Sequence, residues 1–174
     1  HASGGSVEMA RNVAEGTLGL AFVALNAGGA PAGVELTPLA SEPMAVICPA
    51  GHRLTSRRSV VLTDLADEPL AETPPGWGTR IISERAFAAA GLERTPAFEI
   101  NDISTILDLV RNDLAVSLLP AAFVTGDPSL AAVPLRGGGL VFEIALARPS
   151  ARRPGAAAEA LGELIVSRSR ARPR

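Results

Sequence analysis

Few residues of this 174-residue chain have the types and spacing that catalysis or metal binding requires. Of its two histidines, His1 is terminal, and His52 lies in a turn without the set of ligands that zinc needs. No G-x-S-x-G nucleophile elbow accompanies His52, so a Ser-His-Asp triad is not indicated. The glycine-rich stretches lack the P-loop lysine and the G-x-G-x-x-G spacing. We therefore expect no catalytic residues, no metal site and no cofactor.

The single cysteine, Cys48, lies in the apolar run Met44–Cys48 and has no second cysteine in the chain to pair with. A lone cysteine in such a run is typical of a small buried side chain. No neighbour that would activate a thiolate is visible, so a redox or nucleophilic role is not expected.

The stronger candidates are polar residues in loops that open helices, and they indicate ligand binding. Three such places are Gly4–Ser6, Trp77–Thr79 and Asn101–Asp102. Helix N-termini present free N–H groups and a partial positive charge, which attract anions. Capping of the helix alone is the alternative, because it favours the same residue types. The Trp77 loop places the only tryptophan between two glycines, where a core tryptophan is the competing interpretation.

Apolar periodicity predicts the elements that must position these loops. Ser6 is the expected N-cap of the first helix, and Asn101 or Asp102 that of the third. In the last helix Leu161 and Leu164 are expected to face inward. Helices are predicted at 6–15, 79–90, 103–110 and 155–167, and strands at 18–25, 34–39, 44–48, 70–73, 97–100, 114–119, 131–135 and 140–147.

Helices alternating with buried strands predict an α/β fold with parallel sheets. In such folds ligands bind beyond the carboxyl ends of the strands, which is where the three loops would lie. The chain is 47% apolar and 20% charged, as expected for a globular protein. Its net charge is −2 and its basic residues, all arginine, form no stripe, so this chain is not expected to bind DNA itself. No apolar run predicts a membrane span and no signal peptide is visible, so a cytoplasmic location is expected.

An ordered series of segments resembles the effector-binding domain of LysR-type transcriptional regulators. Each segment alone is a weak match, but the series keeps its order over nearly the whole chain. The segments are Glu35–Pro43, Val46–His52, Leu62–Pro69, Pro75–Thr79, Phe98–Asp102 and Ala115–Pro120.

The resemblance implies a type 2 periplasmic-binding-protein-like fold, with two α/β lobes joined by two crossover strands. Residues 1–40 plus 133–174 would form lobe one and residues 41–132 lobe two. The family's first strand and helix of lobe one would precede His1, and its DNA-binding domain would lie N-terminal to them.

The resemblance also implies that a small-molecule effector binds in the cleft between the lobes. Ser6 would contact it from lobe one. Trp77, Gly78 and Thr79 would contact it from the lobe-two loop, and Asn101 and Asp102 from the start of the next helix. An organic anion and an aromatic molecule are both compatible with these residues. Two departures are Gly19, where the family often has an aspartate, and Arg53, where it usually has a proline.

The resemblance further implies an antiparallel dimer, in which the helix at 6–15 packs near the partner's helix at 79–90. DNA would be contacted only through the N-terminal domain, and no membrane is involved. The alternative function is that of a solute-binding component of a transporter, which shares the fold. An enzyme on this fold is a further alternative, disfavoured by the scarcity of histidine, cysteine and paired acids.

Overall fold

The computed structural model describes residues 5–25, 29–137 and 139–170, so that His1, Gly4 and the end of the arginine-rich tail lie outside it. Contacts divide the chain into two compact units. Unit 1 comprises the described parts of His1–Ser41, Gly76–Gly78 and Glu143–Arg174, and unit 2 comprises the described parts of Glu42–Pro75 and Thr79–Phe142.

Two long strands carry the chain from one unit to the other: β2 (Val34–Pro49) and β7 (Val141–Pro149). The sequence suggests two strands interrupted at Ser41–Pro43, but β2 is continuous there. Proline is compatible with an extended backbone where no ladder N–H is required. Residues 133–142, expected in lobe one, group with unit 2 because β6 (Leu130–Pro134) pairs with β2 inside that unit.

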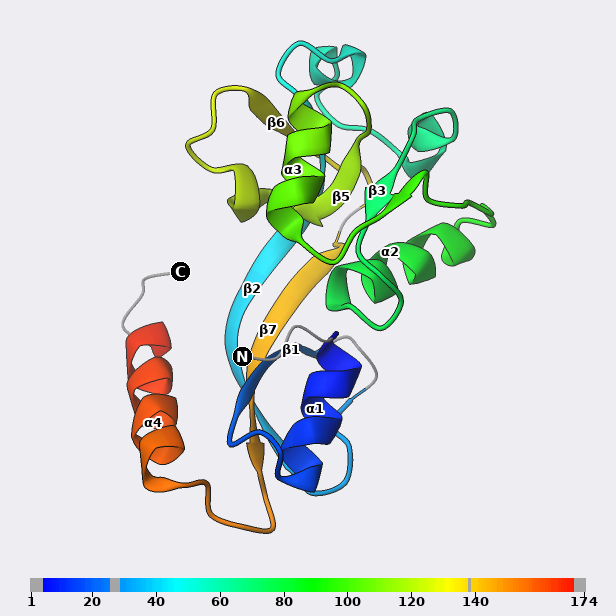
Figure 1. Ribbon diagram of the computed structural model, residues 1–174. Helices are drawn as coiled ribbons and strands as arrows, with labels where there is room; N and C mark the ends of the chain where they lie inside the picture. Colours follow the sequence, from blue (N-terminus) through cyan, green and yellow to red (C-terminus); the bar gives the residue numbers. More distant parts are fainter. Residues whose placement is uncertain (1–4, 26–28, 138, 171–174) are drawn as a thin grey trace. The chain divides into compact units, whose positions relative to one another are not determined.

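In unit 1 a helix lies on each side of the strands β1 (Ala21–Ala24) and β7, as Figure 1 shows for α1 (Ser6–Glu15) and α4 (Ala156–Arg170). β1 and β7 are antiparallel, with Ala21 opposite Ala147. The prediction of a parallel strand after the first helix was therefore wrong. The helix α1 ends where predicted, at Gly16, whose φ of 89° suits a residue without a side chain.

The helix α4 contacts unit 1 along a narrow strip. A Cβ at Gly162 would lie 3.7 Å from Leu146 and 3.8 Å from Leu20, so small residues mediate the contact. Leu161 and Leu164 are each 48% exposed. The prediction that both leucines face inward was wrong for this chain, because the helix is turned with its glycine toward the strands.

The sheet of unit 2 is mixed rather than parallel. The second half of β2 pairs antiparallel with β5 (Ser117–Pro120) on one side and with β6 on the other. A parallel bridge between Leu70 and Val116 connects β5 to β3 (Ala71–Glu72), which pairs in parallel with β4 (Phe98–Glu99).

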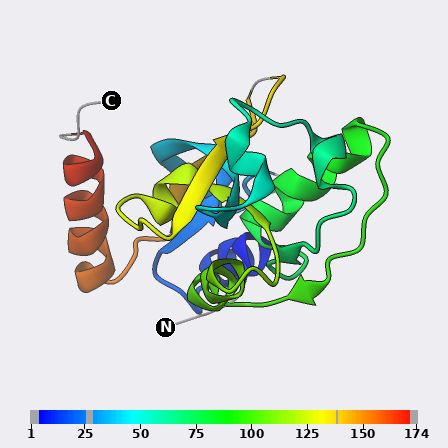
Figure 2. The same cartoon turned by 90° about the horizontal axis from the view of Figure 1, so that it is seen from above.

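Alternating residues of β2 point into two different apolar clusters of unit 2. Val46 belongs to the cluster that α2 (Gly78–Ala89) covers with Ile82 and Phe87. Ile47 belongs to the cluster that α3 (Ile103–Arg111) covers with Ile106 and Val110. The two helices thus lie on different faces of the sheet (Figures 1 and 2). Three short 3-10 turns complete the unit, at Arg53–Ser56, Leu62–Leu65 and Ala121–Val124.

Candidate functional site

Ser6 is the first residue of α1 rather than its N-cap, which is Gly5. Its side chain is 8% exposed, and its Oγ accepts a hydrogen bond of 3.0 Å from the backbone N–H of Ala24 in β1. The expectation that Ser6 caps the helix was therefore wrong, since the hydroxyl ties α1 to β1 instead. The hydroxyl hydrogen has no acceptor among the described residues.

The residues that open α1 lie against part of the tryptophan loop. Gly76–Gly78 group with unit 1, and a Cβ at Gly5 would lie 2.5 Å from the carbonyl oxygen of Gly76 and 3.0 Å from Trp77 Cδ1. Only glycine leaves room for this approach. Trp77 is partly buried and, among the described residues, is a member of none of the three apolar clusters. A role as a core tryptophan is thus not what the structure shows.

Two threonines that flank the loop in the chain, Thr73 and Thr79, are buried and bonded to each other. Thr79, 7% exposed, shares a hydrogen bond of 2.9 Å with Thr73 through their Oγ1 atoms. The hydroxyl of Thr79 is therefore engaged within unit 2. Gly78, the first residue of α2, is buried beside it.

Asp102 caps α3, as one of the two alternatives for that helix predicted. Its Oδ2 accepts hydrogen bonds from the Thr105 N–H at 2.8 Å, the Thr105 hydroxyl at 2.7 Å and the Ser104 hydroxyl at 2.5 Å. These bonds, the hydroxyl of Ser104 first, lower the pKa of Asp102 to about 2. Asn101 is exposed and lies just before the cap. Because the cap is itself a carboxylate, the positive end of α3 is already occupied by negative charge.

A set of charged residues that sequence reasoning missed surrounds the end of β3. Glu72 is 4% exposed and accepts a hydrogen bond of 2.7 Å from the Ser83 hydroxyl. Its other oxygen pairs with Arg94 and lies 3.4 Å from Arg80 Nε. The signal was present as a glutamate inside the short apolar strand Leu70–Thr73, where a charge requires partners.

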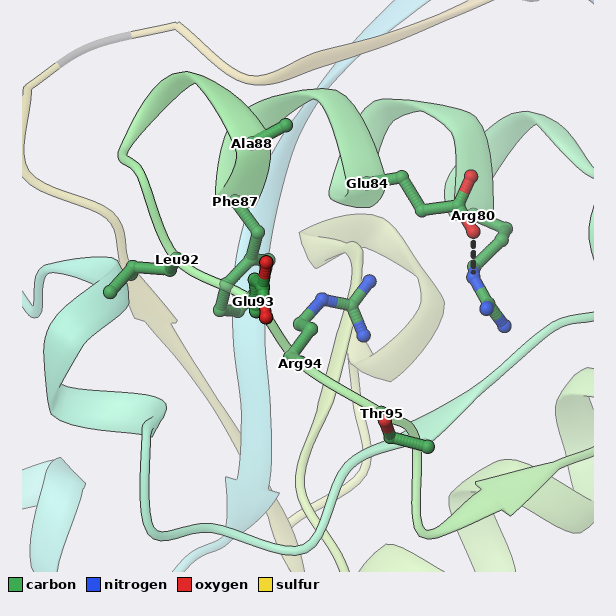
Figure 3. Close-up of a pocket in the computed structure, with 8 residues that line it drawn as sticks. All are labelled: Arg80, Glu84, Phe87, Ala88, Leu92, Glu93, Arg94 and Thr95. Carbon is green, nitrogen blue, oxygen red and sulfur yellow. Dashed lines mark hydrogen bonds and ion pairs between the residues drawn. The ribbon is translucent and has the colours of Figure 1, made fainter.

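Arg80 and Arg94 also line a hollow of about 390 Å³ beside α2 (Figure 3). Arg80 donates to Glu84 at 2.6 Å, whereas Arg94 reaches toward the helix from the loop that follows it. The Arg94 guanidinium lies 4.3 Å above the ring of Phe87, and its buried Nε has no hydrogen-bond partner among the described residues. The guanidinium groups of both arginines thus contact carboxylates, and that of Arg94 also an aromatic ring, and both side chains are mostly buried.

The residues that could support other chemistry are dispersed or buried. Cys48 is fully buried, and burial, followed by the charges of Glu68 and Asp113, raises its pKa to about 11. His52 lies 3.6 Å from Glu68 and its Nδ1 accepts from the Leu54 N–H. Within the described ranges no group of three potential metal ligands occurs. The described helices also include none long and apolar enough to cross a membrane.

Comparisons with known proteins agree with this architecture. The family model "LysR substrate binding domain" matches residues 2–170. A relative from Mycobacterium avium, named as a probable hydrogen peroxide-inducible genes activator, is 32% identical over 171 residues, which cover 91% of this chain and 53% of that protein. The chain thus spans about half the length of this curated relative, and less of several others.

Solved structures share the fold at low sequence identity. The effector-binding domain of QuiR in complex with shikimate has a TM-score of 0.82 at 17% identity, covering 97% of this chain and 79% of that chain. The BenM effector-binding domain with its effector benzoate has a TM-score of 0.72 at 24% identity, with 97% and 77% covered. The type 2 periplasmic-binding-protein-like fold expected from the sequence is therefore confirmed. The chain belongs to the LysR substrate-binding domain family.

Proposed function

We propose that this chain is the ligand-sensing effector-binding domain of a transcriptional regulator and that it binds a small organic molecule. The family match and the curated relatives, which include regulators named as helix-turn-helix proteins, support this over a transporter component or an enzyme. In the full-length protein the domain would signal to an N-terminal helix-turn-helix, the part that contacts DNA.

The effector would bind between the lobes and contact Ser6, the loop Trp77–Thr79, Asn101 and Asp102. The observation that carries this proposal is the state of Ser6. Its oxygen accepts from the Ala24 N–H, and its hydrogen has no acceptor among the residues that the structure describes, beside a helix N-terminus whose cap is a glycine. Such a place favours an anionic or strongly polar group. An effector that contacts both lobes would stabilise the form in which they are closed. This change in lobe angle would alter how the N-terminal helix-turn-helix domains are presented to DNA.

An organic anion with an apolar body is the effector class that the residues support best. The uncapped start of α1 offers donors, and Trp77 offers an apolar plate outside the cores. QuiR and BenM were solved with shikimate and benzoate, which are both small cyclic carboxylates. Since Asp102 carries a negative charge, we place the anionic group near Ser6 and not near α3.

A response to peroxide through Cys48 is disfavoured, although one relative is named for peroxide induction. Thiol oxidation proceeds through the thiolate, and the buried Cys48 has its pKa raised to about 11. The cysteine instead fills the cluster beneath α2.

A thermal-shift screen with small carboxylates and neutral aromatics tests the proposal. We expect a carboxylate such as benzoate or shikimate to raise the melting temperature in a concentration-dependent way. Ser6→Ala and Trp77→Ala should each weaken the shift, whereas the control Arg57→Ala, an exposed change away from these loops, should not. An unchanged thermal shift in both Ser6→Ala and Trp77→Ala would contradict the proposed site.

A further inference from the structure

Glu72 is the only charged residue among the described ones that is buried. Its carboxylate is surrounded by the Ser83 hydroxyl and the guanidinium groups of Arg80 and Arg94. A buried ion pair adds little net stability compared with apolar packing, because desolvation offsets the attraction. Its directional bonds nevertheless fix the relative positions of the segments that carry them.

Contacts made by the neighbours of Glu72 close the two ends of the tryptophan loop. Thr73 directly follows β3. Its carbonyl accepts a hydrogen bond of 3.1 Å from Arg80 Nη1, and its hydroxyl shares a hydrogen bond with that of Thr79. Arg80 follows Thr79 in α2. The loop 74–78 is thus closed at both ends by residues directly adjacent to the buried carboxylate.

Arg80 has no freedom to act as the cation that binds an effector. Besides Glu72 it contacts Glu84 at 2.6 Å and Glu99 at 3.4 Å, and its side chain is 11% exposed. An incoming anion would have to displace these carboxylates. Arg80, which directly follows the loop, instead holds the start of the loop through the Thr73 carbonyl.

We propose that Glu72 is a positioning residue of the ligand loop: through Arg80 and Ser83 it sets the placement of Trp77–Thr79. This inference rests on the proposed function only in that the loop is taken to bind the effector. The partners of Glu72 come from two segments, α2 and the loop after α2, so that removing its charge weakens the link that joins both of them to β3.

The test uses the intrinsic fluorescence of Trp77, which is the only tryptophan in the chain. In Glu72→Gln the amide keeps the shape but leaves the two arginines without their shared counter-charge. We expect acrylamide to quench Trp77 about twofold more efficiently in this variant, because the loop opens locally under native conditions. Ser83→Ala, which removes one neutral partner of Glu72, should raise quenching less and serves if Glu72→Gln fails to fold.

The control separates positioning from general destabilisation. Ile106→Val lowers the stability of unit 2 within the cluster under α3 and touches none of these charged groups. Its quenching should equal that of the wild type. Unchanged quenching in folded Glu72→Gln, or in Ser83→Ala where the former does not fold, would overturn the proposal, as would equal increases in Ile106→Val. Because no ligand is added, the outcome is independent of whether the effector screen succeeds.

Discussion

At the scale of single residues, two of the polar side chains expected to meet an effector already have structural partners. Asp102 holds the first turn of α3, and Thr79 is bound to Thr73. Ser6 differs because its oxygen accepts a hydrogen bond, whereas its hydrogen has no acceptor within the described part of the chain. The residue most able to change partners on binding is therefore Ser6.

The cap of α3 gives a prediction about pH. The pKa of Asp102 falls from 3.8 to about 2 on folding, so its contribution to stability is present above 3.8 and is lost as the pH drops toward 2. Asp102→Ala should lower the melting temperature at neutral pH, and its difference from the wild type should shrink in acid. Thermal denaturation followed by circular dichroism between about pH 6 and pH 2 measures this. Asp67→Ala, at an exposed aspartate, is the control; a difference independent of pH would refute the role of the charge.

Cys48 gives a second prediction at this scale. Since burial raises the pKa of its thiol to about 11, the thiolate that thiol reagents require is scarce at neutral pH. The native chain should not react with a disulfide reagent such as Ellman's reagent, and one thiol should react after unfolding in urea. Fast reaction of the native chain would show that the cysteine is accessible.

Sequence patterns predicted the loops and helix starts better than the bonds that their side chains make. Trp77 between two glycines predicted a loop, which is partly buried in the structure, and Asp102 before an apolar stripe predicted a cap. The bond between Ser6 and Ala24 joins residues far apart in the chain, and no local pattern contains it. Glu72 could be recognised as unusual in its strand, but its partners Ser83 and Arg94 come from other segments.

At the scale of elements, α3 and α4 show what periodicity can and cannot predict. Both helices carry apolar residues at helical spacing, yet Ile106 is fully buried and Leu161 is 48% exposed. The pattern predicts that a helix has an apolar face but not what covers it. Strand direction could not be predicted either, because an apolar run such as β1 is compatible with both parallel and antiparallel sheets.

This contrast predicts unequal costs for similar truncations. Ile106→Ala should lower the free energy of unfolding by about 2–5 kcal/mol, because it leaves a cavity in the cluster under α3. Leu161→Ala should change it by no more than about 0.5 kcal/mol, because a half-exposed leucine leaves little void. Urea unfolding of both variants measures the difference. A large loss in Leu161→Ala would mean that α4 packs more closely in solution than its exposure indicates.

At the scale of the whole molecule, the expected dimer uses the outer face of α1. Val7 on this helix is 49% exposed, although Ala10, one turn further along, and Val13 are buried in unit 1. The resemblance to LysR-type regulators places the partner's second long helix, here α2, against this face. The exposure of Val7 is what such an interface requires, since a partner would cover it.

The proposed dimer can be tested by a substitution at Val7. The chain should have the mass of a dimer by light scattering at high concentration, and Val7→Arg should shift it toward the monomer, because a charge would be buried without a partner. Leu161→Arg is the matched control, since it places the same charge at an equally exposed apolar residue on α4. A monomeric wild type, or a loss of the dimer in Leu161→Arg but not in Val7→Arg, would exclude pairing through α1. Pairing through α1 would bring the N-terminus of this helix, with its Ser6 hydroxyl, next to the interface in both chains. An effector bound at Ser6 could therefore change the affinity of the two chains for each other.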